Sequence, residues 1–217
     1  MGIRAKLFKE LALFSKEHLN PRDCFVCVYG SYASNDFTKE SDLDILFAIE
    51  NNSVVDFKKI RNFVVNLHIG NNLKIDEEVP YENKLVVSYK DIADAVNLKP
   101  FAKKGSKYLI HPITEDKKFL ASREVRLRII LNAFTSPNRY IYGNRTKYIA
   151  FKQKAEKAIL QLSQGLTRKT NLTRKEVLDI LLTGAQGEVG QAHLGYKKER
   201  IKVVKYLKEL ILRNSIS

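Results

Sequence analysis

The most constraining feature of this 217-residue chain is the pair Asp42 and Asp44, which opens an apolar run ten residues after the Gly30-Ser31 turn ends another. On a strand, successive side chains point to opposite faces, so both aspartates share one face. Their carboxylates repel unless a cation joins them. Such hard oxygen ligands suit Mg²⁺, which leaves its other positions to water and substrate phosphates. A Gly-Ser turn brings N–H groups and a hydroxyl to phosphates, so the pattern predicts a metal-assisted phosphate site.

These residues resemble the signature of the polymerase-β-like nucleotidyltransferase superfamily, in a small two-domain form. The signature reads here as Tyr29-Gly30-Ser31, a spacer over residues 32–41, and Asp42-Leu43-Asp44. The resemblance implies that Asp42 and Asp44 bind the metals and that Gly30 and Ser31 bind the phosphates of an NTP. It also implies transfer of a nucleoside monophosphate to an acceptor hydroxyl with release of pyrophosphate. The alternative is a plain hairpin in which Gly30-Ser31 is only a turn.

The superfamily usually supplies a third carboxylate from a later strand, and the segment LKIDEEV at residues 73–79 offers one. If its apolar residues face the core, Asp76 and Glu78 share the opposite face, with Asp76 deeper in the strand. By resemblance, Asp76 completes the second site of a two-metal Mg²⁺ centre or acts as general base on the acceptor. The alternative to a catalytic role is that Asp76, Glu77 and Glu78 form the solvent-exposed end of a strand.

One departure from the superfamily pattern follows the Gly-Ser turn. Many small members carry Ala-Arg-Gly there, whereas this chain has Ala33-Ser34-Asn35. Asn35 tolerates a left-handed backbone and therefore substitutes for the glycine. Ser34 does not supply the charge of the arginine. Triphosphate binding then depends on a basic residue elsewhere, such as Lys74 or one in the second half of the chain.

The expected fold class is α+β, with a small mixed β-sheet nucleotidyltransferase domain over residues 1–113 and an α-helical bundle domain over residues 114–217. Apolar residues at helical spacing predict an amphipathic N-terminal helix through Leu7, Leu11 and Phe14. Period-two and helical patterns predict strands at 25–29, 44–49, 73–75 and 85–89, and helices at 32–37, 55–67, 89–97, 117–134, 146–163, 174–183 and 187–213.

The two cysteines, Cys24 and Cys27, have the spacing of a redox pair but lie in an apolar strand. Residues three apart on a strand point to opposite faces, so we expect two buried, reduced thiols. No run approaches the ~18 to 20 apolar residues of a membrane span. A cytoplasmic protein is the natural expectation.

The net charge of +14 bears on the acceptor, because a strongly basic enzyme attracts anions. RNA fits this charge as acceptor, and the alternative is a compositional preference for lysine without a target.

The segment 138–148 either stacks a base on Tyr140 and Tyr142 or is a tyrosine-bearing loop packed on the core. Two other functions remain open. One is an antibiotic (aminoglycoside-type) nucleotidyltransferase, and the other is a non-catalytic nucleotide- or RNA-binding regulator or antitoxin-like protein.

Overall fold

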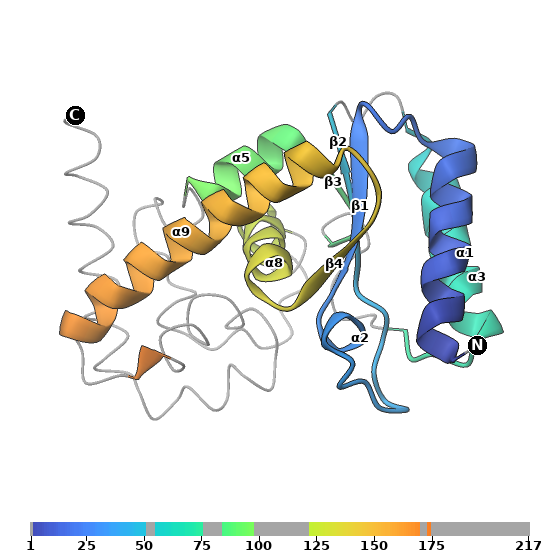
Figure 1. Cartoon of the computed structure of the whole chain (residues 1–217), viewed down its shortest axis with the longest axis horizontal. Coiled ribbons are helices and arrows are strands. Elements are labelled where there is room, and N and C mark those ends of the chain that lie inside the picture. The colour runs from blue at the N-terminus through green and yellow to red at the C-terminus, as the bar shows by residue number, and fades with distance from the viewer. Residues whose placement is uncertain (1, 51–54, 76–83, 98–121, 170–172, 175–217) are drawn as a thin grey trace.

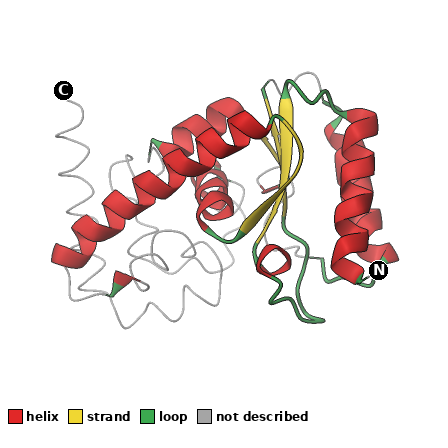
Figure 2. Cartoon of the chain, viewed as in Figure 1, coloured by secondary structure: helices red, strands yellow, loops and turns green. Residues whose placement is uncertain are grey.

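The structure, a computed structural model, describes residues 2–50, 55–75, 84–97, 122–169 and 173–174. Helices and strands alternate along this part of the chain (Figures 1 and 2). Their order is α1 (Ile3–His18), β1 (Cys24–Tyr29), α2 (Ser31–Ser34), β2 (Ile45–Ile49), α3 (Phe57–Gly70), β3 (Val86–Ser88), α5 (Tyr89–Val96), α8 (Arg123–Thr135), β4 (Asn138–Gly143) and α9 (Arg145–Lys169).

The four strands form one mixed sheet in the order β3-β2-β1-β4, which confirms the predicted mixed sheet. Strand β1 is antiparallel to both β2 and β4, while β3 is parallel to β2. Because of these directions, the end of β1 and the beginnings of β2 and β3 lie at the same edge of the sheet. The Gly-Ser and Asp-x-Asp residues are therefore neighbours at this edge, where α2 begins (Figure 1).

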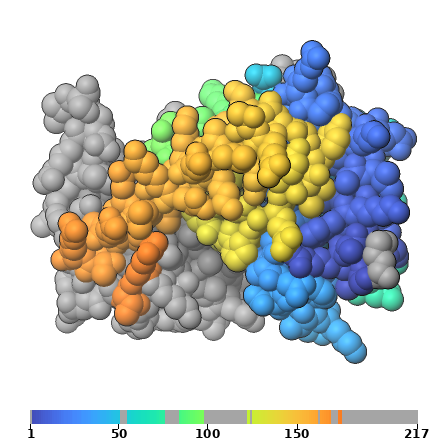
Figure 3. Space-filling view, in the orientation of Figure 1, coloured from blue at the N-terminus to red at the C-terminus, as the bar shows by residue number. Residues whose placement is uncertain are grey.

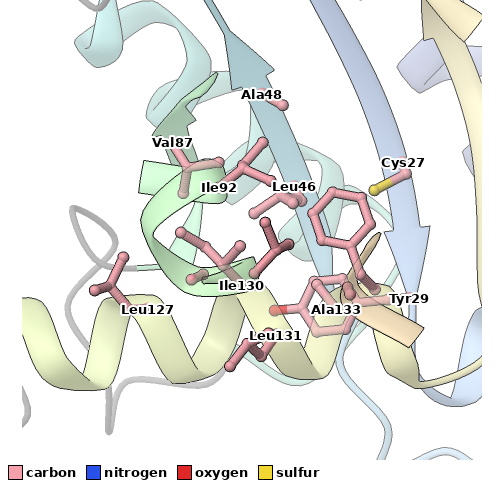
Figure 4. Packing of buried hydrophobic residues seen from close by; sticks show 14 of the residues in the cluster. Cys27, Tyr29, Leu46, Ala48, Val87, Ile92, Leu127, Ile130, Leu131 and Ala133 are labelled. Carbon is pink, nitrogen blue, oxygen red and sulfur yellow. The ribbon is translucent and has the colours of Figure 1, made fainter. Parts of the chain in front are cut away.

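Helices cover both faces of the sheet, as Figure 1 shows. Helices α1 and α3 cover one face, and α5, α8 and α9 cover the other. Every residue of β1 and β2 is buried, because each strand contributes alternate side chains to two separate apolar clusters. Figure 4 shows the cluster on the α5 and α8 side, where Leu46 and Ala48 of β2 meet Ile92 and Ile130. Continuous apolar strands of this kind are typical of a sheet covered on both faces.

The amphipathic N-terminal helix is confirmed as α1. Leu7 and Leu11 are fully buried, and the ring of Phe14 stacks on Phe63 of α3 with a centroid distance of 3.9 Å. Burial of side chains of this size stabilises a fold by about 1.5 to 3 kcal/mol each. None of the helices in the described ranges has the length and apolar character that crossing a bilayer requires.

The two cysteines are buried on opposite faces of β1, as predicted. Cys24 belongs to the α1 and α3 cluster and Cys27 to the α5, α8 and α9 cluster, and both thiols are free. Burial raises the pKa of Cys24 to about 11 and that of Cys27 to about 12. Both thiols are therefore protonated and unreactive in the folded protein at neutral pH.

The segment predicted as a tyrosine-bearing loop is a strand, β4. Its residues pair with β1, and the register shifts between Val26 and Cys27. Gly143 ends β4 with a φ of +95°, and a Cβ there would lie 2.2 Å from the carbonyl oxygen of Cys24, so only glycine fits. Both tyrosines pack against the core clusters, and their hydroxyls donate to backbone carbonyls of Gly143 and Leu19. The predicted packing of the tyrosines on the core is confirmed. The predicted loop conformation was wrong, because pairing with β1, a tertiary contact, decides it.

The remaining predictions concern a strand at 73–75, the later helices and the domain boundary. Residues 73–75, predicted as a strand, have no regular secondary structure. Helices α8 and α9 correspond to the helices predicted at 117–134 and 146–163. The helix at 187–213, nearly all of the one at 174–183, and the boundary between residues 113 and 114 lie outside the described residues. A division at that boundary separates β4 from the sheet that it completes.

An ion-pair network joins α5 to α8. Arg126 of α8 donates to Asp91 at 3.0 Å and to the carbonyl of Val86 at 2.8 Å, while Arg123 pairs with Asp94. Asp91 also forms a capping box with Ser88, the N-cap residue of α5. Burial raises the pKa of Asp91, but the charge of Arg126 and the hydrogen bonds from Ser88 and Arg126 outweigh it, so this pKa lies below its usual value.

We expect Asp91→Asn to lower the free energy of unfolding at pH 7 by about 1.5 to 3 kcal/mol, the range for hydrogen bonds to a charged group. Because the folded-state pKa of Asp91 is depressed, the carboxylate stabilises the fold above its unfolded pKa of about 3.9, and this contribution is lost as the pH falls through the folded pKa. Urea unfolding at pH 7 and below pH ~4 measures the difference. Glu40→Gln, at an exposed carboxylate, is the control. A difference independent of pH contradicts the prediction.

Candidate active site

The Gly-Ser turn connects the end of β1 to α2. Gly30 has φ 71° and ψ −147°, a backbone conformation that residues other than glycine rarely adopt. Its N–H donates to the carbonyl oxygen of Pro137 at 3.0 Å, so the residue before β4 helps to hold the turn. Ser31 begins α2, which has only four residues and ends at Ser34. This arrangement fixes the turn at the edge of the sheet where β2 begins.

The Asp-x-Asp segment has the predicted alternation. Leu43 and Ile45 belong to the cluster under α1 and α3. Asp44 lies on the other face, against Gly30: a Cβ on Gly30 would lie 2.6 Å from Asp44 Oδ2. The carbonyl oxygen of Asp44 also accepts the N–H of Tyr29 at 3.1 Å. The two motifs are therefore in direct contact, and the missing side chain of Gly30 makes room for the Asp44 carboxylate.

Asp42 and Asp44 line one small cavity of about 20 Å³. A space of this size holds about one water molecule, or an ion of similar size. Two carboxylates at one cavity are the ligand set from which proteins bind Mg²⁺ together with water and substrate phosphates. The carboxylate pair is therefore chemically suited to a magnesium ion, while the rest of the lining is Tyr29, His68, Lys84 and four apolar residues. Within the described ranges, no group of three or more His, Cys, Asp and Glu side chains is arranged to hold a metal.

Asp76, the predicted third carboxylate, lies outside the described residues, as do Glu77 and Glu78. The described chain ends at Ile75 on one side of this gap and resumes at Lys84, which lines the cavity with Asp42 and Asp44. The assignment of Asp76 stays a prediction.

Lys84 is a basic residue that the sequence analysis missed. It lines the same cavity as the two aspartates and directly precedes Leu85, whose carbonyl oxygen accepts the N–H of Phe47 at 2.8 Å. Lys74, which the sequence analysis named, is exposed and does not line this cavity. No local pattern distinguishes Lys84 from other lysines, because the pairing of β3 with β2 places it there.

Two arginines bind the end of α2, where the superfamily pattern has an arginine that this chain lacks. Asn35 is left-handed, with φ 77°, as predicted. The carbonyl oxygen of Ala33 accepts from Arg4 Nη2 at 3.0 Å and from Arg139 Nε at 3.1 Å, and Arg4 Nη1 donates to Asn35 Oδ1 at 2.9 Å. Neither arginine lines the cavity. Arg4 belongs to α1 and Arg139 to β4, so two segments far from α2 in the sequence hold this helix in place. A local sequence pattern does not reveal such contacts.

His68 of α3 also lines the cavity, and it is only 4% exposed. Its Nδ1 lies 2.8 Å from the carbonyl oxygen of Val64, and its Nε2 accepts the N–H of Leu43 at 3.2 Å. Burial lowers the pKa of His68; the charge of Lys84 acts in the same direction, against the effects of Asp42 and the backbone hydrogen bonds. The sequence analysis missed this residue, and its only signal was the spacing of four from Val64 on the buried face of α3.

A family model described as a nucleotidyltransferase domain matches residues 9–120, more than half of the chain. The chain belongs to the nucleotidyltransferase domain family. The match confirms the family that the Gly-Ser and Asp-x-Asp residues indicated, and it supports a transferase that acts on an NTP. The searches of curated proteins and of solved structures gave no significant match. The matched range contains Gly30, Asp42, Asp44 and Asp76, whereas α8, β4 and α9 lie beyond it.

We expect Gly30→Ala to destabilise the protein and to disrupt the site. A side chain in this backbone conformation costs about 1 to 3 kcal/mol, and its Cβ would displace the Asp44 carboxylate 2.6 Å away. Urea unfolding and Mn²⁺ binding measure the two effects. Gly70→Ala is the matched control, because a Cβ at the end of α3 would meet nothing within 4 Å. Normal Mn²⁺ affinity in Gly30→Ala would contradict the geometry of the site.

Proposed function

We propose that this protein is a Mg²⁺-dependent nucleotidyltransferase that moves a nucleoside monophosphate from an NTP to an acceptor hydroxyl. The observation that carries the proposal is the contact between the two motifs: Asp44 lies against Gly30, and Asp42 and Asp44 line one cavity. The family match supports the general reaction.

Asp42 and Asp44 hold the magnesium in this proposal, and Asp76 completes a two-metal site or accepts the proton of the acceptor hydroxyl. Bound Mg²⁺ supplies positive charge that stabilises the attacking and leaving oxygens. Gly30 leaves room for the Asp44 carboxylate at the turn that faces the triphosphate. In this proposal the Ser31 hydroxyl donates a hydrogen bond to the triphosphate. The acceptor oxygen forms a bond to the α-phosphorus, the bond from that phosphorus to the bridging oxygen breaks, and pyrophosphate leaves.

We assign the missing basic contact to Lys84. The support is its place in the wall of the cavity with Asp42 and Asp44. A triphosphate bound at the mouth of this small cavity would bring its oxygens to the Lys84 ammonium group. A lysine binds phosphate as a compact point charge. Arg4 and Arg139 are directed at the carbonyl of Ala33 and serve the position of α2 instead.

RNA is the acceptor class that the charge favours, given a net charge of +14. Helix α9 forms a long ridge across the surface in Figure 3. Its exposed basic side chains are Arg145, Lys147, Lys154, Lys157 and Arg168. In this proposal helix α9, which follows β4 and packs on the sheet, helps to receive the acceptor. A positive net charge also attracts a polyanion such as RNA, and the proposed enzyme acts on RNA in the cytoplasm.

The proposal predicts that Asp42→Asn and Asp44→Asn each abolish transfer. The test is pyrophosphate release and label transfer from each of the four α-labelled NTPs with Mg²⁺, in the presence of total RNA, a protein lysate or aminoglycosides. Asp36→Asn, at an exposed aspartate, is the control. Full activity in either site variant contradicts the proposal.

The acceptor fraction that becomes labelled decides among the functions named from the sequence. Label in RNA supports the charge argument. Label in an aminoglycoside or in a protein replaces RNA by that acceptor. An NTP that binds without pyrophosphate release under any of these conditions indicates a regulatory protein.

The assignment of Lys84 has its own test. We expect Lys84→Gln to raise the KM for NTP about 10-fold or more, since a hydrogen bond to a charged group contributes about 1.5 to 3 kcal/mol. Lys74→Gln is the matched control, because that lysine is exposed outside the cavity. Equal KM values in the two variants would show that the triphosphate is bound by another group.

A further inference from the structure

His68 makes a link between helix α3 and the backbone between the two aspartates. It lies in the last turns of α3, which spans Phe57–Gly70, while Leu43 lies 25 positions earlier in the chain. The hydrogen bond from the Leu43 N–H to His68 Nε2 is buried, with a length of 3.2 Å. His68 is also among the few buried polar side chains of the described part, most of whose core is apolar.

The hydrogen bonds of the ring determine its protonation. Nε2 accepts from a backbone N–H, so it carries no proton. Nδ1 faces the carbonyl oxygen of Val64 at 2.8 Å and must donate to it. Only the neutral ring with its proton on Nδ1 satisfies both contacts. Because both nitrogens are occupied, His68 has no free nitrogen with which to exchange a proton with substrate.

The Leu43 N–H belongs to the planar peptide that joins Asp42 to Leu43. Holding this peptide restricts the ψ angle of Asp42 and the φ angle of Leu43, two of the four backbone torsion angles between the α-carbons of Asp42 and Asp44. Strand β2 begins only at Ile45, so the strand ladder does not hold this peptide. His68 therefore acts on the torsion angles that bring Asp42 and Asp44 to one cavity.

The backbone of His68 makes a second connection. Its carbonyl oxygen accepts the N–H of Asn71 at 3.2 Å and that of Leu73 at 2.9 Å. Leu73 precedes Asp76 by three positions. One residue of α3 thus holds the peptide between Asp42 and Leu43 by its side chain, and by its carbonyl the segment up to Leu73 that precedes Asp76, the predicted third carboxylate.

We propose that His68 is a positioning residue for the metal-binding aspartates, holding Asp42 and Asp44 at the spacing that one divalent cation requires. This inference rests on the proposed function, since it gives the two carboxylates the role of metal ligands. Residues that orient metal ligands typically change metal affinity about 10- to 100-fold when they are replaced. A residue that only fills the core changes stability without this specific effect.

Two variants separate the two hydrogen bonds of the ring. The side-chain carbonyl of Gln reaches the place of Nε2 and can still accept from Leu43, whereas the shorter side chain of Asn reaches only the place of Nδ1 and keeps the bond to Val64. Each variant loses one buried hydrogen bond, so both should be destabilised to a similar degree. Only His68→Asn leaves the Leu43 N–H without its acceptor.

We expect His68→Asn to bind Mn²⁺ about 10- to 100-fold more weakly than His68→Gln, as measured by electron paramagnetic resonance of free Mn²⁺. Activity of His68→Asn should recover as the metal concentration rises, which a lost proton-transfer group would not allow. In the metal-free protein, the Leu43 amide should exchange with solvent about 10-fold faster in His68→Asn than in His68→Gln. Equal Mn²⁺ affinity and equal exchange in the two variants overturn the inference.

If the proposed function is wrong, the Mn²⁺ measurement on the wild type itself shows it, before any His68 variant is compared. If the wild type binds no Mn²⁺, or binds it as tightly after Asp42→Asn, the metal site is refuted, and with it the metal-positioning role of His68. The exchange rate of the Leu43 amide then still reports whether the hydrogen bond exists. If neither His68 variant folds, the wild type supplies the measurement: nitrogen NMR should show Nδ1 protonated and Nε2 unprotonated. A protonated Nε2 overturns the inference.

Discussion

The Asp44 carboxylate occupies the space that a side chain at position 30 would need, and this is the constraint on which the site depends. It requires a glycine in a backbone conformation that other residues avoid, and it requires β2 to start beside the end of β1. The hydrogen bond from Tyr29 to Asp44 and that from Gly30 to Pro137 hold the two motifs in this arrangement. The catalytic sheet therefore has little freedom at this edge: a shift of one residue in the pairing of β1 with β2 would turn Asp44 toward the apolar cluster under α1 and α3.

Local patterns predicted the parts of the fold that local physics decides. The period of two in β2, the helical spacing of Leu7, Leu11 and Phe14, and the left-handed conformation of Asn35 each follow from a few neighbouring residues. The opposite burial of the two cysteines follows from the same alternation. The same alternation and the spacing from Gly30-Ser31 allowed Asp42 and Asp44 to be named as neighbours at one cavity.

Contacts between distant segments escaped the sequence analysis. Strand β4 exists because β1 pairs with it, and its tyrosines and Gly143 fit that pairing; the residues alone were also compatible with a loop. His68 and Lys84 reach the cavity through the packing of α3 and the pairing of β3. The family match ends at residue 120, yet Pro137 and Arg139 beyond it hold the Gly-Ser turn and α2. The edge of the sheet that carries the two motifs is thus completed by residues outside the matched range.

The division of the core by the sheet has a further consequence. The chain has only two cysteines, and each belongs to a different cluster, Cys24 to the one under α1 and α3 and Cys27 to the one under α5, α8 and α9. A thiol reagent reaches a buried sulfur only when the layer that covers it opens. Cys24 also lines a cavity of about 510 Å³ at the start of β1, whereas Cys27 is fully buried within its cluster. The modification rate of Cys27 therefore reports the local opening of the layer formed by α5, α8 and α9, without any added label.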